Sequence, residues 1–305
     1  MEIIYRADSL TEQKLIATVG FFDGVHLGHR FLIDTMCCLG KERGLASVVF
    51  TFPVHPRIVL QADYQPKLLN SFEEKMERLA TTNADYCIVL DFTLELAAYP
   101  ASDFLAFLAN EWNVQILQVG YDHRFGHNRA EGFDQYVKYG SGLGIEVIHA
   151  SSFKTERGAV SSSKIRQLLA ESKVDEAAEL LTYPYRLKGH IISGRQVGRK
   201  LGFPTANIQV DEPFKVWPGT GVYAVWVYLC GNRYKGMLSI GSRPTFDDEQ
   251  QAIEVHLLNF SGTVYQEVIE VEFVHFIREV QKFATIDALK AQLKNDRERV
   301  DKILV

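Results

Sequence analysis

The chain has 305 residues, more than a single hydrophobic core commonly serves, so its length predicts two domains. Hydrophobic residues make up 47% and charged residues 23%, which are ordinary values for a soluble globular enzyme, and neither tail has the biased composition of a disordered segment. The net charge of -5 argues against a broad basic surface for nucleic acid or anionic lipid, so we expect small-molecule partners and no nucleic acid.

Neither a leader nor a membrane-spanning segment is expected. The chain starts with MEIIYRADSL, which contains charged residues and lacks the apolar run of a signal peptide. The most apolar stretch, 222–230, is about half as long as a helix that crosses a bilayer. We therefore expect a cytoplasmic protein without a membrane partner, and a monomer or a weak homo-oligomer.

Up to about residue 183, apolar strand-like runs alternate with helix-like segments. This alternation predicts a Rossmann-like α/β domain, in which helices cover both faces of a parallel sheet. Such sheets bind ligands at the carboxyl ends of their strands, where the loops that start at Gly20 and Gly120 would share one rim. The expected strands are 15–20, 46–52, 86–90, 114–120 and 145–149.

After residue 183 the pattern changes to short runs rich in Val, Ile, Tyr and Phe, separated by glycine turns. Such runs predict an antiparallel barrel or sandwich. Thr285 is a plausible N-cap, and the apolar residues after it have helical spacing, so a final helix is expected. The expected strands of this part are 221–230, 234–240, 253–260 and 268–276. The sequence thus predicts one domain over 1–183 and a second over 184–305.

The first candidate site follows the first expected strand, in the segment GFFDGVHLGH. The strand should turn sharply into a helix that starts near His29, which places His26 and His29 beside free N–H groups that favour anions. Paired imidazoles can donate hydrogen bonds to a phosphorus centre as charge builds in a transition state. The alternative is that both are ordinary surface or core histidines without a catalytic role. Nucleotide-binding residues expected in this loop are Gly20, Asp23, Gly24 and Gly28.

A serine-rich segment, VSSSKIR, precedes an amphipathic stretch and could form a second anion-binding helix start. The same serines could simply cap the helix. Together, these two motifs resemble the adenylyltransferase module of prokaryotic bifunctional riboflavin kinase/FAD synthetases. The resemblance implies that ATP is bound and that AMP passes to FMN, giving FAD and pyrophosphate. It carries over His26, His29, Ser162, Ser163 and Arg166.

The segment GYDHRFG resembles a loop that helps to seat the flavin-side substrate in this family. It differs from the family pattern at His123, where phenylalanine is usual. By this resemblance, the expected flavin-binding residues are Asp122, Phe125 and Gly126.

The second candidate site lies in GRQVGRKLGFPTAN, whose glycines lack the Gly-Lys-Ser/Thr of a P-loop. Thr205 and Asn207 are two positions apart in an extended segment and so face the same side. Their neutral oxygens could help to hold a hydrated Mg²⁺ against nucleotide phosphates. A hydrogen-bonded turn after the proline is the alternative. Gly198 and Gly202 are the other nucleotide-binding residues expected here.

Glu254 interrupts an otherwise apolar strand and is either solvent-facing or a base. A base there would take the proton of a substrate hydroxyl that attacks a γ-phosphate. The segments LGFPTAN, GVY, GSRPT and EVHLLNF resemble successive landmarks of the riboflavin kinase module, so the resemblance covers essentially the whole chain. It implies a six-stranded barrel that phosphorylates riboflavin, with Thr205 and Asn207 at Mg-ATP and Glu254 as the base.

The sequence therefore predicts a two-step enzyme that converts riboflavin to FMN and FMN to FAD, using ATP and Mg²⁺ in each step. Residues 1–183 would form the FMN adenylyltransferase domain and 184–305 the riboflavin kinase domain. Two alternatives stay open. One is a riboflavin kinase whose first domain adenylylates weakly or not at all, and the other is a non-catalytic flavin or nucleotide sensor.

Overall fold

The computed structural model of the chain describes residues 1–5, 13–61, 63, 66–121, 124–127, 131–151, 153–155, 158–194, 198, 201–244, 249–262 and 264–305. Contacts group them into two compact units, Met1–Ser162 and Ser163–Val305. Each unit carries its own sheet and its own buried core.

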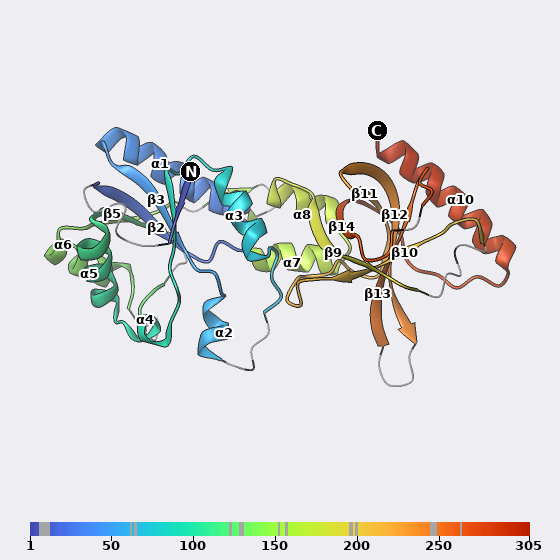
Figure 1. Ribbon diagram of the computed structural model, residues 1–305. Helices are drawn as coiled ribbons and strands as arrows, with labels where there is room; N and C mark the ends of the chain where they lie inside the picture. The colour runs from blue at the N-terminus through green and yellow to red at the C-terminus, as the bar shows by residue number, and fades with distance from the viewer. Residues whose placement is uncertain are drawn as a thin grey trace. The chain divides into compact units, whose positions relative to one another are not determined.

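The first unit is built on a six-stranded sheet in the order β1-β4-β3-β2-β5-β6 (Figure 1). All of its pairings are parallel, as the alternating pattern predicts. From β2 the chain proceeds outward through β3 and β4, whereas β5 and β6 lie on the other side of β2, so the order reverses between β2 and β5. A reversal of this kind opens a crevice at the carboxyl ends of the two strands. The strands are β1 (Glu2–Ile4), β2 (Leu15–Val19), β3 (Ala46–Thr51), β4 (Tyr86–Val89), β5 (Val114–Val119) and β6 (Glu146–His149).

Helices pack on both faces of this sheet and form two separate cores. On one face, α1 (Leu27–Arg43) and α3 (Phe72–Ala80) bury their apolar residues against alternate positions of the strands. On the other, α5 (Ala101–Trp112) and α6 (Phe133–Leu143) do the same. Two short helices, α2 (Pro56–Leu60) and α4 (Leu94–Ala98), lie in the connections after β3 and β4. A small hairpin is formed by β7 (Lys154–Thr155) and β8 (Gly158–Ala159).

The second unit is a closed antiparallel barrel with the strand order β10-β13-β12-β11-β14-β9. The six-stranded barrel expected from the resemblance is thus confirmed. Its strands are β9 (Tyr185–Ile192), β10 (Ala206–Val210), β11 (Gly221–Leu229), β12 (Asn232–Pro244), β13 (Glu249–Leu257) and β14 (Val268–Arg278).

The boundary between the two units lies between Ser162 and Ser163, earlier in the chain than the change of sequence pattern at residue 183. Helices α7 (Ser162–Ala170) and α8 (Val174–Leu181) join the barrel by their contacts. The carbonyl of Leu169 accepts a hydrogen bond from the Gly219 N–H at 2.8 Å, and the Tyr223 hydroxyl donates to Ser172 Oγ at 2.9 Å. A pattern of strands cannot reveal such contacts, because helices of either domain have the same periodicity.

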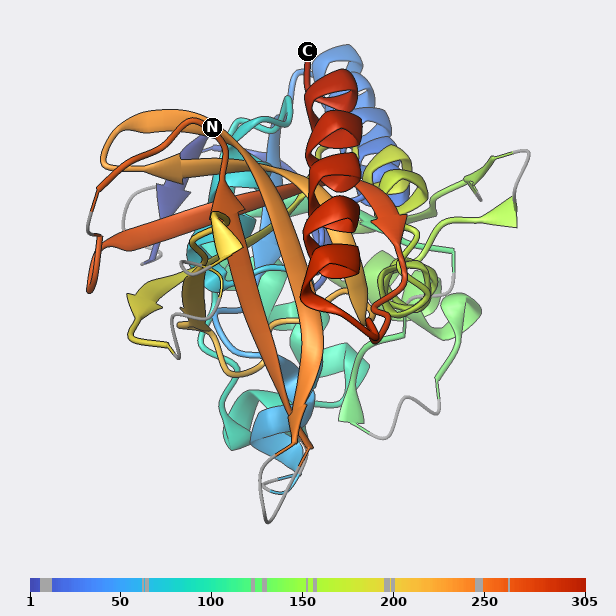
Figure 2. The same ribbon diagram turned by 90° about the vertical axis from the view of Figure 1, so that its right-hand side faces the viewer.

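The final helix, α10 (Ile286–Ile303), begins at the predicted N-cap, since Thr285 Oγ1 accepts from the Ala288 N–H at 3.1 Å. The helix lies along the barrel (Figure 2) and buries Val300 against it. A buried ion pair fixes its position. Asp296 is 0% exposed, and its carboxylate accepts from Nε and Nη2 of Arg278 in β14 at 2.8–3.1 Å.

No helix among the described residues has both the length and the apolar character that a membrane span requires.

Replacing Asp296 by alanine is expected to destabilise the second unit by about 3–5 kcal/mol, because it leaves the Arg278 guanidinium partly buried and uncompensated. Asp301 on the same helix forms a more exposed pair with Lys235, so Asp301→Ala is the matched control and should cost less than about 1 kcal/mol. Urea unfolding followed by circular dichroism measures both. Equal losses in the two variants would show that the pair does not anchor the helix.

Candidate functional sites

The loop after β2 presents two histidines at the start of α1. His26 is the N-cap of the helix and is buried, and its Nδ1 accepts a hydrogen bond from the His29 backbone N–H at 3.4 Å. The two imidazoles stack, with ring centroids 3.7 Å apart and planes inclined by 16°. Because His26 Nδ1 accepts, the hydrogen of the neutral ring is on Nε2. The pair therefore offers N–H donors next to a helix N-terminus, which is a favourable arrangement for an anion.

Asp23 holds this loop in place from the inside. Its Oδ1 accepts from the backbone N–H groups of Leu69 and Asn70 at 2.9 and 3.3 Å, and its own carbonyl accepts from Ser162 Oγ at 2.9 Å. The next residue, Gly24, has φ of 85°, a conformation that favours glycine. Ser162, the second serine of the serine-rich segment, is thus brought to the histidine loop. Ser163 and Arg166 belong to the second unit.

Gly20 and Gly28 flank the loop. Gly20 directly follows β2 and donates its N–H to the Phe50 carbonyl at 3.0 Å. A Cβ on Gly28 would lie 3.2 Å from the His26 ring and 3.3 Å from the Val160 carbonyl, so the backbone passes close to the imidazole here. Both predicted glycines accordingly shape the histidine loop.

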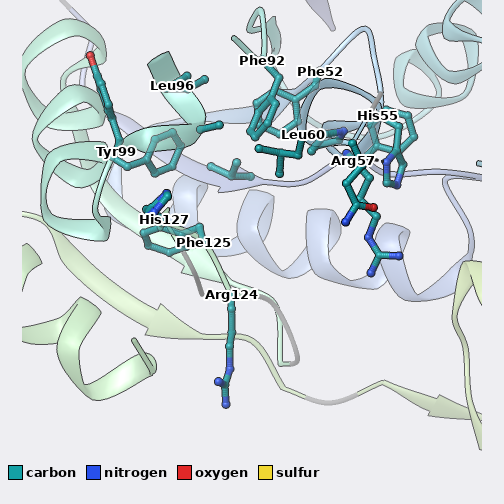
Figure 3. A pocket seen from close by; sticks show the side chains of 17 residues that line it. Phe52, His55, Arg57, Leu60, Phe92, Leu96, Tyr99, Arg124, Phe125 and His127 are labelled. Atoms are coloured by element: carbon teal, nitrogen blue, oxygen red, sulfur yellow. Dashed lines mark hydrogen bonds between the residues drawn. The ribbon is translucent and has the colours of Figure 1, made fainter. Parts of the chain in front are cut away.

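A pocket of about 550 Å³ opens at the carboxyl edge of the sheet (Figure 3). Loops that follow β2, β3, β4 and β5 all contribute to its walls, so it occupies the crevice where the strand order reverses. Most of its side chains are aromatic or aliphatic, and its basic side chains are those of His55, Arg57, Arg124 and His127. Figure 3 shows the Arg57 and Arg124 side chains extending away from the aromatic rings. The apolar lining includes Phe21, Phe52, Leu60, Phe92, Leu96, Tyr99, Phe104 and Phe125.

Two of the three predicted flavin-binding residues, Phe125 and Gly126, line this pocket. The Phe125 ring stacks on Tyr136 with centroids 4.1 Å apart, and the Tyr136 hydroxyl donates to the Phe125 carbonyl at 3.0 Å. Asp122 lies outside the described residues. No site residue was predicted in the segments after β3 and β4, which form part of the pocket wall. The segment TFPVHPR (residues 51–57) could have suggested the part after β3, whereas the sequence around Phe92 and Tyr99 offered no signal.

The barrel brings the predicted kinase residues together. In the antiparallel pair of β10 and β13, Asn207 lies directly opposite Glu254. Residues paired in this way project from the same face of a sheet. Thr205 Oγ1 donates to Glu254 Oε2 at 3.2 Å, so all three polar side chains meet at one end of the strand pair.

Gly194, in the glycine-rich sequence before Thr205, lies very close to this cluster. A Cβ on Gly194 would collide with the Asn207 side-chain amide, so only glycine allows the backbone to lie there. The carbonyl of Gly198 accepts from the Phe203 N–H at 2.9 Å, and Gly202 has φ of 83°. Gly194 therefore lies against the strand that carries Asn207, and the backbone bond holds Phe203 close to Gly198.

His256, two positions beyond Glu254, ties the PTAN segment to β13. Its Nδ1 is 2.8 Å from the Pro204 carbonyl, and since a carbonyl can only accept, Nδ1 carries the hydrogen. The ring packs edge-on against Phe203. Burial lowers the pKa of His256 below its ordinary value; the bond to Pro204 opposes this shift, and Arg297 adds to it.

No group of three or more His, Cys, Asp or Glu side chains in the described part of the chain could by itself hold a metal ion. The oxygens of Thr205, Asn207 and Glu254 are hard ligands that suit a cation shared with phosphate groups and water. The donor set at the barrel is thus compatible with Mg²⁺ brought by a nucleotide.

His256 should make the stability of the second unit depend on pH. The unfolded chain takes up a proton near the ordinary histidine pKa of about 6.5, whereas the folded barrel resists it, so folding free energy is lost as the pH falls below that value. Urea midpoints measured from pH 7.5 to 5 should fall less in His256→Gln than in the unchanged protein. Parallel curves would exclude His256 as the responsible group.

Two family models match the chain in succession. The FAD synthetase model covers residues 8–164, and the riboflavin kinase model covers residues 181–304. The first contains the histidine loop and the pocket, and the second contains the whole barrel.

Curated relatives are similar along most of their length. The bifunctional riboflavin kinase/FMN adenylyltransferase of Listeria monocytogenes is 35% identical over 95% of this chain and 93% of its own. That of Escherichia coli K12 is 35% identical over 96% of this chain and 94% of its own. A solved structure from Streptococcus pneumoniae, described as a macrolide-efflux protein, superposes with a TM-score of 0.87 at 30% identity and covers 98% of both chains. With both modules present in order, the chain belongs to the family of bifunctional riboflavin kinase/FMN adenylyltransferases.

Proposed function

We propose that the two transfers of this family take place at two separate sites of the chain, with the residues described above. The barrel phosphorylates riboflavin to FMN, and the first unit joins AMP from ATP to FMN, giving FAD and pyrophosphate. The observation that carries the proposal is the meeting of Thr205, Asn207 and Glu254 at one end of a strand pair, in a unit that holds none of the histidine loop.

At the barrel, Glu254 acts as the general base. It removes the proton of the ribityl hydroxyl as that oxygen attacks the γ-phosphorus of ATP, and ADP leaves. The hydrogen bond from Thr205 orients the carboxylate, and Asn207 lies opposite to it. Gly194, Gly198 and Gly202 let the backbone at these three positions approach the bound nucleotide closely.

Thr205 and Asn207 would also hold Mg²⁺ together with the nucleotide phosphates. When bound, the ion neutralises phosphate charge during transfer. The neutral oxygens of these side chains and the neighbouring carboxylate fit a cation that keeps several of its waters.

In the first unit, a phosphate oxygen of FMN attacks the α-phosphorus of ATP, and the bond from that phosphorus to pyrophosphate breaks. His26 and His29 donate hydrogen bonds to the oxygens that gain charge. The start of α1 and the backbone at Gly20, Asp23, Gly24 and Gly28 bind the nucleotide. Ser162, Ser163 and Arg166 bind the same nucleotide.

The pocket at the edge of the sheet receives the flavin ring. Its volume of about 550 Å³ lies within the usual range for ligand sites, and its aromatic walls suit a flat, fused ring system. Its titratable lining in the described residues consists of arginine, histidine and tyrosine, which favours the phosphate end of FMN over a cationic ligand. Phe125, Gly126 and Asp122 are the residues that we assign to the flavin.

We further propose residues 1–183 as the adenylyltransferase domain and 184–305 as the kinase domain. The first range keeps the serine-rich segment with the histidine loop to which Ser162 is bonded. The expected setting is a cytoplasmic monomer or weak homo-oligomer that binds small molecules and no nucleic acid.

Single substitutions should separate the two activities. His29→Ala should abolish FAD formation while FMN is still made from riboflavin, because only the adenylyl transfer loses its donor. Asn207→Ala should abolish FMN formation from riboflavin while supplied FMN is still converted to FAD. Chromatographic separation of the flavins after incubation with ATP and Mg²⁺ measures both.

In the same assay, the unchanged protein distinguishes the alternatives. If FMN forms but FAD does not, the protein is a riboflavin kinase only. If neither FMN nor FAD forms, the sensor alternative is favoured. Loss of both activities in either variant would contradict two independent sites.

Phe125→Ala should raise the KM for FMN by about 2- to 10-fold, the effect of about 0.5–1.5 kcal/mol of aromatic contact. The KM for riboflavin at the barrel should not change. Phe107, a partly buried phenylalanine of the same unit outside the pocket lining, provides the control variant Phe107→Ala. An unchanged KM for FMN in Phe125→Ala would remove the flavin from this pocket.

A further inference from the structure

Lys75 in α3 is a lysine buried behind the pocket. It is 2% exposed, although the burial of an ammonium group is costly. Its Nζ donates to the Phe52 carbonyl at 2.6 Å and lies 3.9 Å from the centroid of the Phe21 ring. Phe21 and Phe52 both line the pocket, so one ammonium group contacts two adjacent segments of its wall.

These two segments follow neighbouring strands and are joined a second time. Phe21 comes after β2 and Phe52 after β3, and Thr51 Oγ1 donates to the Phe21 carbonyl at 3.2 Å. His55, which also lines the pocket, packs edge-on against the same Phe21 ring at 4.8 Å. A shift of the Phe21 ring would therefore change the shape of the pocket.

Burial lowers the pKa of Lys75 to about 7, and the charges of Asp23 and Cys87 act in the opposite direction. Burial raises the pKa of the Cys87 thiol to about 12, so this group is neutral near pH 7 and Asp23 provides the negative charge. Asp23 belongs to the histidine loop, whose backbone it anchors. The ammonium group thus contacts the wall of the proposed flavin pocket and interacts electrostatically with the proposed nucleotide loop.

We propose that Lys75 is a positioning residue for adenylyl transfer: its charged ammonium group holds the Phe21 ring and the Phe52 carbonyl in the arrangement that binds the flavin ring of FMN. The inference rests on the proposed assignment of the pocket to the flavin. A neutral amine still donates to a carbonyl, but it loses the attraction of a cation to the ring face. Flavin affinity in the first unit therefore depends on the charge of this lysine.

The unchanged protein provides the first test. Between pH 7 and 9 the phosphate of FMN has already lost its second proton, which has a pKa of about 6. As Lys75 loses its proton in this range, the KM for FMN should rise several-fold, while the KM for riboflavin at the barrel stays the same. Of the groups that face Nζ, the Cys87 thiol stays neutral in this range because burial raises its pKa to about 12, and the charge of Asp23 favours the protonated lysine. A flat KM for FMN would overturn the proposal.

Lys75→Met keeps the length of the side chain and removes both charge and donor. The expected result is a KM for FMN at pH 7 raised about tenfold, with kcat changed less, and no further rise up to pH 9. Lys138→Met, which makes the same change at an exposed position of α6, is the control and should behave as the unchanged protein. Riboflavin kinase activity of the same preparations should be equal.

Phe125→Ala in the same assay separates the two proposals. If it raises the KM for FMN and Lys75→Met does not, the pocket binds the flavin and the role of Lys75 is refuted. If neither variant raises it, the pocket assignment fails and the inference with it. If Lys75→Met lowers kcat and the circular dichroism signal together without a pH-dependent KM, the lysine is structural and the proposal is also refuted.

Discussion

Strand order and register decide which residues of this chain meet. In the barrel, closure fixes β10 against β13, and this register sets Asn207 opposite Glu254. In the first unit, β2 lies between β3 and β5, so the loops after all three strands border the same crevice. A slip of one residue in a strand would move its side chains to the other face. Neither site could form from its loop sequence alone.

The polar side chains that are buried close to these sites share one feature. Each is hydrogen-bonded to groups from a distant part of the chain. Asp23 is bonded to residues 69 and 70 and to Ser162, and Lys75 to Phe52. Burial of an unpartnered polar group is unfavourable, so these bonds offset a cost that an apolar residue would not impose. A core that served stability alone would be expected to replace Lys75 with an apolar side chain, which is why a functional reason for the ammonium group is worth testing.

The sequence predicted those features that depend on local pattern. Alternation of strands and helices indicated the parallel sheet, and short β-rich runs with glycine turns indicated the barrel. The five expected strands of the first domain all form, within a residue or two of their expected ends. The strand β1 was not foreseen, because three residues carry too little periodicity.

Features that depend on packing between distant segments were not predicted. The contribution of Phe92 and Tyr99 to the pocket follows from the place of β4 in the sheet, which no local pattern encodes. The association of α7 and α8 with the barrel depends on contacts such as that between Leu169 and Gly219. Lys75 lies in a helix rich in charged residues, where a lysine is usually exposed, so its burial could only be seen in the fold.

The two proposed sites also differ in the chemistry that their nucleophiles require. A ribityl hydroxyl must lose its proton as it attacks phosphorus, and the barrel accordingly presents a carboxylate beside Thr205. The phosphate of FMN, with a second pKa of about 6, is already an anion at neutral pH and needs no base. What it needs is relief of repulsion between two anions, which N–H donors at a helix start provide. This difference would account for a glutamate at the proposed kinase site and a pair of stacked histidines at the proposed adenylyltransferase site.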